Sequence, residues 1–270
     1  MAPIATIGPE NTMDLDLTGR TVLITGASKG IGAAAAEAFA QEGCHLILAV
    51  RSGEALEALC QRLRSAHQIQ ARAVPTDLRD PVQLAALAEA GRDADVLVNN
   101  AGDIPGGALE AVDEARWRHA WELKVFGYIN LTRAIYAHMK ARGSGVIIND
   151  IGAAGERMDA GYIAGSTGNA ALYAFTRALG GKSLKDGVRV VGVSPGPVET
   201  DRIVTLMQTA AERRFGDASR YPELMANYPL GRPAKPREIA DMMAFLASDR
   251  SAYTTGVVVT IDGGIGASPG

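Results

Sequence analysis

Short apolar runs alternate along the chain with longer segments in which apolar residues recur at helical spacing. Each run is rich in β-branched residues and is followed by a turn, a pattern typical of parallel strands joined by crossover helices. Strands are predicted over residues 21–25, 45–50, 71–75, 96–99, 146–151, 189–193 and 257–261. Helices are predicted at about 30–42, 52–66, 80–91, 113–141, 161–182 and 235–247. The pattern predicts an α/β fold with a doubly wound, seven-stranded parallel sheet and helices on both faces.

The same pattern predicts the domain organisation. No Pro/Ser-rich linker divides the chain, so residues 17–270 are expected to form one domain after an N-terminal arm over residues 1–16. The segment from about 201 to 230 interrupts the alternation and is too long for a plain connection. Insertions of this kind are often lids. A surface helical hairpin unrelated to any site is the alternative.

Composition excludes several classes of partner. The chain is 47% hydrophobic and 21% charged, with a formal net charge of −3. Charges of both signs are interspersed, so the sequence predicts no basic face for nucleic acid. No apolar run reaches the ~18 residues that cross a bilayer, and the N-terminal segment lacks the pattern of a secretory signal. We expect a cytoplasmic protein without nucleic-acid or membrane partners.

The cysteines and histidines predict no metal site. Cys44 and Cys60 lie in separate predicted elements and are expected to be reduced, structural thiols. The 4 histidines are scattered over different elements without the spacing of metal ligands.

A glycine-rich turn follows the first predicted strand. It reads Thr-Gly-Ala-Ser-Lys-Gly-Ile-Gly over residues 25–32 and leads into an alanine-rich helix. Gly26 permits the tight turn, Gly30 lets the backbone approach a pyrophosphate, and Gly32 lets the helix pack close to the sheet. Amides at the start of the helix would then face the anion. Such turns also occur for steric reasons alone, so this one depends on its context.

Further motifs follow the ends of successive strands, where the ligand crevice of such a sheet lies. They are Thr76-Asp77-Leu78, Asn99-Asn100-Ala101-Gly102, Ser194-Pro195-Gly196-Pro197-Val198-Glu199-Thr200 and Ile261-Asp262-Gly263-Gly264. Together with the Gly-x-x-x-Gly-x-Gly turn, they make the chain resemble the short-chain dehydrogenase/reductase family from Leu17 to about Gly264. The resemblance implies a Rossmann-type fold that binds a nicotinamide dinucleotide.

The resemblance also implies residue roles. Asp77 would hydrogen-bond the adenine amino group, and Leu78 would contact the adenine ring. Asn99 would fix the adenosine ribose region, unless it only caps the sheet edge. Ala101 and Gly102 would line the cofactor.

The segment over residues 195–200 would surround the nicotinamide. By the resemblance, the backbone of Val198 would meet the carboxamide, and Thr200 would lie near the phosphates. The predicted cofactor contacts are Gly26, Ser28, Lys29, Gly30, Ile31, Gly32, Arg51, Asp77, Leu78, Asn99, Ala101, Gly102, Pro195, Gly196, Val198 and Thr200.

The end of the second strand decides which dinucleotide is favoured, because an acid there binds a ribose diol and repels a 2′-phosphate. That position holds Val50, followed by Arg51, and Lys29 in the glycine turn adds a second cation. A dianionic 2′-phosphate attracts such a pair. The sequence therefore predicts NADP(H) over NAD(H). The alternative is that Arg51 only begins a helix and is solvated.

The family's usual catalytic residues do not stand at the matching positions. The family carries Asn on the fourth helix, Ser after the fifth strand, and Tyr and Lys four apart on the next helix. When the chain is aligned on Ala170-Ala171-Leu172 and Phe175-Thr176-Arg177, those positions hold, in that order, Lys124, Gly152, Gly165 and Asn169. The alternative assigns Tyr162 to the tyrosine position, which requires a three-residue insertion before the alignment anchor.

One regularity appears among these replacements: the Asn and Lys of the family are exchanged, as Lys124 and Asn169. Asp150 lies two residues before Gly152 and would point from the same strand face. A buried carboxylate needs a partner. We hypothesise a Lys124–Asp150–Asn169 cluster beneath the nicotinamide pocket, with Tyr162 at its rim. A purely structural ion pair is the alternative.

Three classes of function follow. The first is an NADP(H)-dependent oxidoreductase with a non-standard active site, acting on an unidentified carbonyl or alcohol. The second is a cofactor-binding protein without redox turnover, and the third is a lyase or isomerase that reuses the pocket. The partner would be a small-molecule substrate. The resemblance also implies a homodimer or homotetramer assembled through the helices at 113–141 and 161–182.

Overall fold

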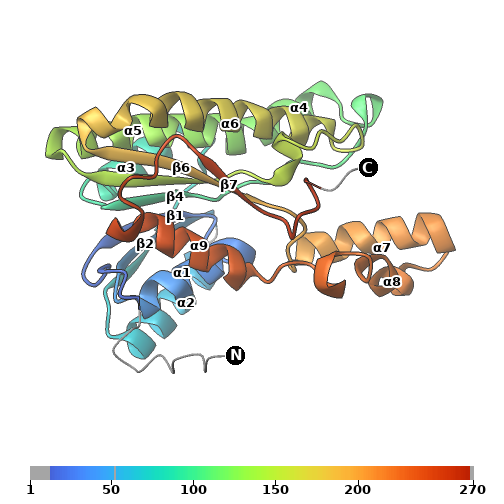
Figure 1. Cartoon of the computed structure of the whole chain (residues 1–270), viewed down its shortest axis with the longest axis horizontal. Helices are drawn as coiled ribbons and strands as arrows, with labels where there is room; N and C mark the ends of the chain where they lie inside the picture. The colour runs from blue at the N-terminus through green and yellow to red at the C-terminus, as the bar shows by residue number, and fades with distance from the viewer. Residues whose placement is uncertain (1–12, 52, 268–270) are drawn as a thin grey trace, which may run out of the picture.

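The computed structural model describes residues 13–51 and 53–267, and its centre is one parallel sheet (Figure 1). The strand order is β3-β2-β1-β4-β5-β6-β7, all pairs being parallel. The strands are β1 Thr21–Thr25, β2 His45–Val50, β3 Ala71–Pro75, β4 Val96–Asn99, β5 Gly145–Asp150, β6 Val188–Pro195 and β7 Val258–Ile261. From β1 the chain adds β2 and β3 on one side and then crosses to add β4 on the other side. This switch in strand order leaves a crevice between β1 and β4 at the carboxyl ends of the strands. The predicted doubly wound fold is confirmed.

Helices cover both faces of the sheet (Figure 1). One face carries α1 Gly30–Gln41, α2 Gly53–His67 and α9 Pro236–Ala247. The other carries α3 Pro81–Ala90, α4 Glu114–Trp121, α5 Gly127–Arg142 and α6 Ile163–Ser183. Residues 1–12 of the predicted arm lie outside the described residues. Within the described part of the chain, no helix is long and apolar enough to cross a membrane.

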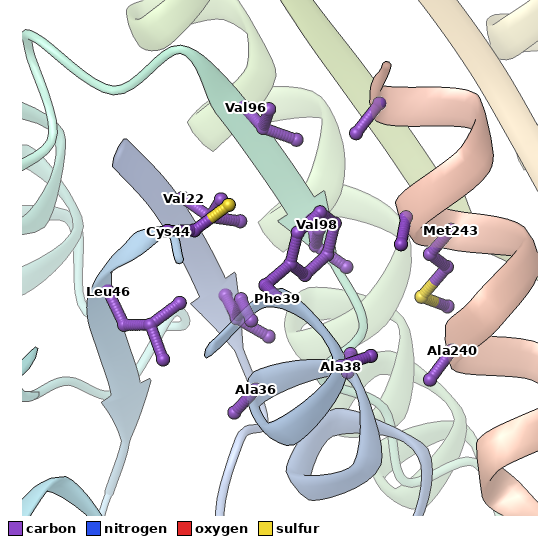
Figure 2. Packing of buried hydrophobic residues seen from close by; sticks show 14 of the residues in the cluster. Val22, Ala36, Ala38, Phe39, Cys44, Leu46, Val96, Val98, Ala240 and Met243 are labelled. Carbon is purple, nitrogen blue, oxygen red and sulfur yellow. The ribbon is translucent and has the colours of Figure 1, made fainter. Parts of the chain in front are cut away.

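Strand alternation divides the core into two layers. Val22 and Ile24 of β1 face α1 and α9, whereas Leu23 between them faces the α3 and α5 side. Phe39 of α1 and Met243 of α9 come together with the sheet in the first layer (Figure 2). These are long apolar side chains with almost no exposure, so they fix the distance between the helices and the strands.

The single helix predicted over 113–141 is wrong in one respect. A π-helical segment, Glu122–Phe126, separates α4 from α5. A π segment accommodates one extra residue in a turn and turns the following side chains relative to the preceding ones. Helical periodicity alone does not reveal such an insertion, because the segments on both sides keep the same period.

The 201–230 segment forms two helices beside the main body (Figure 1). They are α7 Asp201–Phe215 and α8 Tyr221–Met225. The Arg220 guanidinium lies 4.1 Å from the centre of the Phe215 ring, and the Tyr228 hydroxyl donates to Met207 Sδ at 3.5 Å. These contacts hold the two helices together as one unit, which we call the 201–230 segment throughout.

A buried arginine ties β6 to the end of α9. Both terminal nitrogens of Arg189 donate to main-chain oxygens at the helix end, including those of Leu246 at 2.6 Å and Ser248 at 3.0 Å. Its side chain also donates to Ser251 Oγ at 3.1 Å. The last carbonyls of a helix have no partner within the helix. Arg189 therefore satisfies several of them inside the protein, where water does not reach.

Arg189→Met is expected to lower the free energy of unfolding by about 3 kcal/mol, because it leaves buried carbonyl oxygens without donors. Urea denaturation measures this change. The control is Arg250→Met, which removes a half-exposed arginine that donates to the Asp14 carbonyl and is expected to change stability by less than about 0.5 kcal/mol. Equal losses in the two variants would contradict the assignment.

Candidate functional site

A cleft of about 1760 Å³ runs along the carboxyl ends of the strands. It is larger than the roughly 300–1,000 Å³ of a typical small-molecule pocket, so it has room for a dinucleotide and a second ligand together. Its wall combines the glycine turn, the ends of β2 to β6, the loop after β5 and the 201–230 segment. Segments far apart in sequence meet here because parallel strands all end at the same edge.

The glycine turn is held in place by the side chain of Asn100. Its Nδ2 donates to the carbonyls of Thr25 at 2.9 Å and Gly26 at 3.1 Å. The Thr25 hydroxyl in turn accepts from the Asn100 backbone amide at 3.0 Å. A Cβ on Gly26 would come within 2.8 Å of the Asn100 amide, and one on Gly32 within 2.5 Å. Both glycines are therefore required by the close approach of β4 to this turn.

The start of α1 is open toward an anion. Lys29 is the N-cap residue, and its side chain makes no cap hydrogen bond. Gly30 has φ +57, a conformation that favours glycine, and a Cβ there would lie 3.1 Å from the Thr200 methyl. Lys29, Gly30, Ile31 and Thr200 all line the cleft. The first amides of this helix are thus available to a phosphate group.

Asn100 lines the cleft, whereas the predicted Asn99 does not. Asn99 is fully buried, and its Nδ2 donates to Thr132 Oγ1 at 3.0 Å and to Asn149 Oδ1 at 2.9 Å. As the last residue of β4, Asn99 still follows the strand's alternation and points into the layer beneath α5. Its Oδ1 is buried and has no hydrogen-bond partner among the described residues, so the contact expected with the adenosine ribose region stays a prediction.

The Asp77 carboxylate, predicted to contact the adenine, is held by a neighbouring arginine. The Asp77 carboxylate accepts from Arg79 Nε at 2.8 Å and from the Arg79 backbone amide at 3.0 Å. The hydrogen bond from the Arg79 side chain lowers the pKa of Asp77. Thr76 and Leu78 on either side of it line the cleft, but Asp77 does not. Arg79 therefore binds the carboxylate that the Thr76-Asp77-Leu78 motif would present to the adenine.

The β2 end of the cleft is uncharged or positive. Val50, Arg51, Ser28 and Lys29 line it. Among the described residues that line the ends of β2 and β3, there is no carboxylate. The two cations that the sequence predicted for a 2′-phosphate are therefore at the same end of the cleft.

The opposite end is built by the chain after β6. Pro195, Gly196, Val198 and Thr200 line the cleft as predicted. The Glu199 backbone amide donates to the Ala234 carbonyl at 2.8 Å, and Ala234 donates back to Pro197 at 2.9 Å. This pairing fixes the segment as a short extended stretch. Its position is thus rigid where a planar ring could lie against it.

Lys124 enters the cleft from the π-helical segment. Its stem lies over Gly102, where a Cβ would come within 2.8 Å of Lys124 Cδ. The ammonium donates to the Ile151 carbonyl at 2.6 Å. π-helical turns are frequent at functional sites because they redirect one side chain. Both Gly102 and the π turn therefore contribute to the position of this ammonium group.

Asp150 is the last residue of β5 and is 7% exposed. It continues the row of Val146 and Ile148, which faces α1 and α9. Burial raises the pKa of its carboxyl group to about 6, although the nearby positive charge of Lys124 lowers it. Asp150 lines the cleft. It is thus a buried acid at the edge of the ligand space.

Asn169 of α6 points toward the loop after β5. Its Nδ2 donates to the Gly152 carbonyl at 3.3 Å. Its Oδ1 is buried and has no hydrogen-bond partner, although the side chain lines the cleft and the residue is only 3% exposed. A buried polar atom without a partner is rare and costly. This oxygen is placed to accept a hydrogen bond from a ligand in the cleft.

The ring of Tyr162 lies directly over Gly165. A Cβ on Gly165 would come within 2.0 Å of both Tyr162 Cε1 and Cζ. No side chain at residue 165 can coexist with this position of the ring. Tyr162 lines the cleft and adopts φ −137 and ψ 41, which is why α6 begins at Ile163 and not at the predicted residue 161.

The structure thus brings Lys124, Asp150, Asn169 and Tyr162 to one cleft. Lining residues that the sequence did not single out are Asn100, Arg157, Asp159, Glu199 and Asp262. Asn100 and Asp262 belong to motifs that the sequence did show, so their position after a strand was an available signal. Arg157 and Asp159 lie in the loop after β5, where no pattern in the sequence indicated a role. Among the described residues, no group of His, Cys, Asp and Glu could hold a metal ion.

Comparison with known proteins gives consistent matches. A family model described as enoyl-(acyl carrier protein) reductase matches residues 26–266. The oxidoreductase UcpA of Escherichia coli strain K12 is 35% identical over 254 residues, covering 92% of this chain and 95% of that protein.

Two solved structures extend the comparison. L-sorbose reductase from Gluconobacter frateurii, complexed with NADPH and L-sorbose, has a TM-score of 0.88 and 30% identity, covering 95% of this chain and all (100%) of that one. A 7α-hydroxysteroid dehydrogenase complexed with NADH and 7-oxoglycochenodeoxycholic acid has a TM-score of 0.83 and 27% identity, covering 93% and 96%. Similar structures therefore hold either nicotinamide dinucleotide.

Asp150→Asn is expected to stabilise the protein more at about pH 8 than at about pH 4. The raised pKa means that the folded state holds the Asp150 proton more tightly than the unfolded chain. Its contribution therefore favours folding at low pH and is lost as the pH rises through about 6. Asn mimics the neutral acid at every pH, so its advantage over Asp should grow by about 2–3 kcal/mol across this range. Urea denaturation at both pH values measures it; a pH-independent difference would contradict the raised pKa.

Proposed function

The chain belongs to the short-chain dehydrogenase/reductase family, and we propose that it is an NADP(H)-dependent oxidoreductase with a non-standard active site that interconverts a carbonyl and an alcohol. The proposal of a non-standard active site rests on the Tyr162 ring, which lies over Gly165 within the cleft. The substrate is a small molecule whose identity the side chains do not specify.

The cleft suits a nicotinamide dinucleotide. The open start of α1 and the glycines at 26 and 30 suit the pyrophosphate, and the segment over residues 195–200 suits the nicotinamide. The unpartnered Asn169 Oδ1 marks a place where a ligand hydroxyl or amide would donate. When bound, the cofactor supplies or accepts the hydride. Every other task falls to side chains of this chain.

Single substitutions back to the family's usual catalytic residues would not rebuild the usual site. Gly152, at the serine position, has φ +115, which side chains rarely adopt. Gly165, at the tyrosine position, is covered by the Tyr162 ring. Lys124 and Asn169 stand in each other's family positions. These contacts support a rearranged site and not a site that has lost single groups.

Tyr162 is proposed as the group that exchanges a proton with the substrate oxygen. In reduction its phenol would donate the proton to the carbonyl oxygen, and in oxidation its phenolate would accept the hydroxyl proton. Lys124 supplies a positive charge in the same cleft, which would stabilise a developing alkoxide. Asn169 would position the ligand through its free oxygen. This division gives each of the exchanged residues a task.

The 201–230 segment is proposed as a lid over the substrate. Ile203, Leu206 and Met207 of α7 and Tyr228 line the cleft with apolar surface. Met158, from the loop after β5, is 62% exposed and lines the cleft as well. An apolar wall of this kind favours a substrate with a hydrocarbon body next to its carbonyl or alcohol group.

Assembly into a homodimer or homotetramer through α5 and α6 is also proposed. Phe126, just before α5, and Leu184, just after α6, are large apolar side chains that are 44% and 46% exposed in the single chain. Burial between subunits would remove both side chains from water. A cytoplasmic location remains a prediction of the sequence.

Tyr162→Phe is expected to lower kcat by about 100-fold or more because it removes the proton donor, while cofactor affinity stays unchanged. Gly165→Ala should produce a similar loss, because the new methyl group displaces the ring. The double variant should be no worse than either single one, since both act on the same group. A panel of alcohols and ketones, followed at the nicotinamide absorbance, provides the assay.

Tyr253→Phe is the matched control, because this tyrosine is 99% exposed. Additive losses in the double variant, or full activity in Tyr162→Phe, would remove Tyr162 from the mechanism. Loss of activity in Lys124→Met alone would then assign the proton to Lys124. Binding of cofactor without any turnover on the panel would favour a protein that binds the cofactor without redox chemistry.

Arg51→Ala is expected to weaken NADPH binding about tenfold while leaving NADH binding nearly unchanged, because only NADPH carries the 2′-phosphate that the guanidinium would meet. Calorimetric titration with each cofactor measures the two affinities. The control is Arg92→Ala, in the exposed turn before β4 at the opposite edge of the sheet. Equal affinity of the unchanged protein for both cofactors would overturn the preference.

A further inference from the structure

We propose that the Asp150 carboxylate makes the cleft prefer the oxidised, positively charged nicotinamide over the reduced, neutral one. This inference rests on the proposed function, since it requires a nicotinamide cofactor in the cleft. It adds a preference between the two redox forms of the cofactor and assigns it to one residue.

The position of Asp150 supports the proposal. It ends β5, and its neighbour across the sheet is Val193 of β6, two residues before Pro195. The chain from Pro195 to Thr200 forms the end of the cleft proposed for the nicotinamide. Asp150 lines the same space and lies on the α1 side of the sheet, as Val146 and Ile148 do. Its carboxyl group is therefore at the nicotinamide end, far from the Arg51 end.

The surroundings of Asp150 make its charge effective. The residue is 7% exposed and its neighbours on the same face of the sheet are apolar, so little water screens the carboxylate. Ile148 and Val193 on the same strand face belong to the apolar core. A buried acid at the end of an apolar row lowers the stability of the fold. Residues that break the apolar pattern in this way are concentrated at functional sites.

Two other groups lie near Asp150, and both stay in place when Asp150 alone is changed. The Tyr128 hydroxyl donates to the Asp150 main-chain oxygen at 3.0 Å, not to the carboxylate. Lys124 is the positive charge that acts on Asp150, and its ammonium donates to the Ile151 carbonyl. The cation is thus held from the side of the π segment, and the carboxylate faces the α1 side of the sheet.

The chemistry of the cofactor converts this charge into a preference. The nicotinamide ring carries a positive charge when oxidised and none when reduced, and the rest of the dinucleotide is the same in both forms. A carboxylate in poor contact with water attracts the charged ring and leaves the neutral one unaffected. The change in the ratio of the two affinities when Asp150 is replaced therefore reports the contribution of its carboxylate.

The test compares NADP⁺ and NADPH binding to the full-length protein and to Asp150→Asn at about pH 8. Calorimetry measures each dissociation constant without any substrate. The Asn variant keeps the size of the side chain and removes its charge. We expect it to bind NADP⁺ about tenfold more weakly relative to NADPH than the unchanged protein does. Asp93→Asn is the control, because it removes an exposed acid at the opposite edge of the sheet and should leave the ratio unchanged.

The outcomes separate this inference from the proposed function. A fall in the NADP⁺ to NADPH preference in Asp150→Asn alone supports it. An unchanged ratio overturns the inference and leaves the proposed oxidoreductase intact. An equal fall in Asp93→Asn also overturns it, because the effect would then be one of net charge. If neither form of the cofactor, phosphorylated or not, binds the unchanged protein, the proposed function itself fails. Should Asp150→Asn not fold, Asp150→Ala gives the same comparison.

Discussion

The site depends on the hydrogen bonds that Asn100 makes across the switch point of the sheet. Its side chain holds the carbonyls of Thr25 and Gly26, and the Thr25 hydroxyl accepts from its backbone amide. These bonds join the end of β4 to the turn between β1 and α1. The strands β1 and β4 are neighbours in the sheet but far apart in sequence. The glycines at 26 and 32 follow from it, because a side chain at either position would occupy the space of the Asn100 amide. The open start of α1 is a consequence of the same packing.

At the other end of the cleft, two glycines allow two different contacts. Gly165 allows the Tyr162 ring to fold back over α6, whereas Gly152 adopts a positive φ and brings its carbonyl to Asn169. Lys124 reaches the same region because of the π turn and the absence of a side chain on Gly102. The proposed active site therefore depends on contacts that only glycine permits. A side chain at residue 165 would collide with the Tyr162 ring, and a Cβ at residue 152 would come within 3.0 Å of the Asn169 Nδ2.

Much of the fold could be predicted from the sequence, because apolar β-branched runs and glycine turns are local signals. The bounds of β1, β2, β3 and β4 agree residue for residue with those predicted. Asn100 could have been identified in the same way, because the predicted strand ends at Asn99 and leaves Asn100 as the first residue after it. The engagement of Asp77 by Arg79 and the π turn at Lys124 are instead decided by side-chain packing, which periodicity does not contain. The seating of Tyr162 on Gly165 is a contact between two residues whose spacing suggested no more than adjacency on a helix.

A fluorescence titration with NADPH tests the central claim most directly, namely that this edge of the sheet is a working nicotinamide site. The account predicts saturable binding of one equivalent per chain, and its loss in Gly30→Val, where a branched side chain would meet Thr200 and cover the start of α1. A folded protein that shows no saturable binding of NADPH or NADH, or that binds equally well with Gly30→Val, would contradict it.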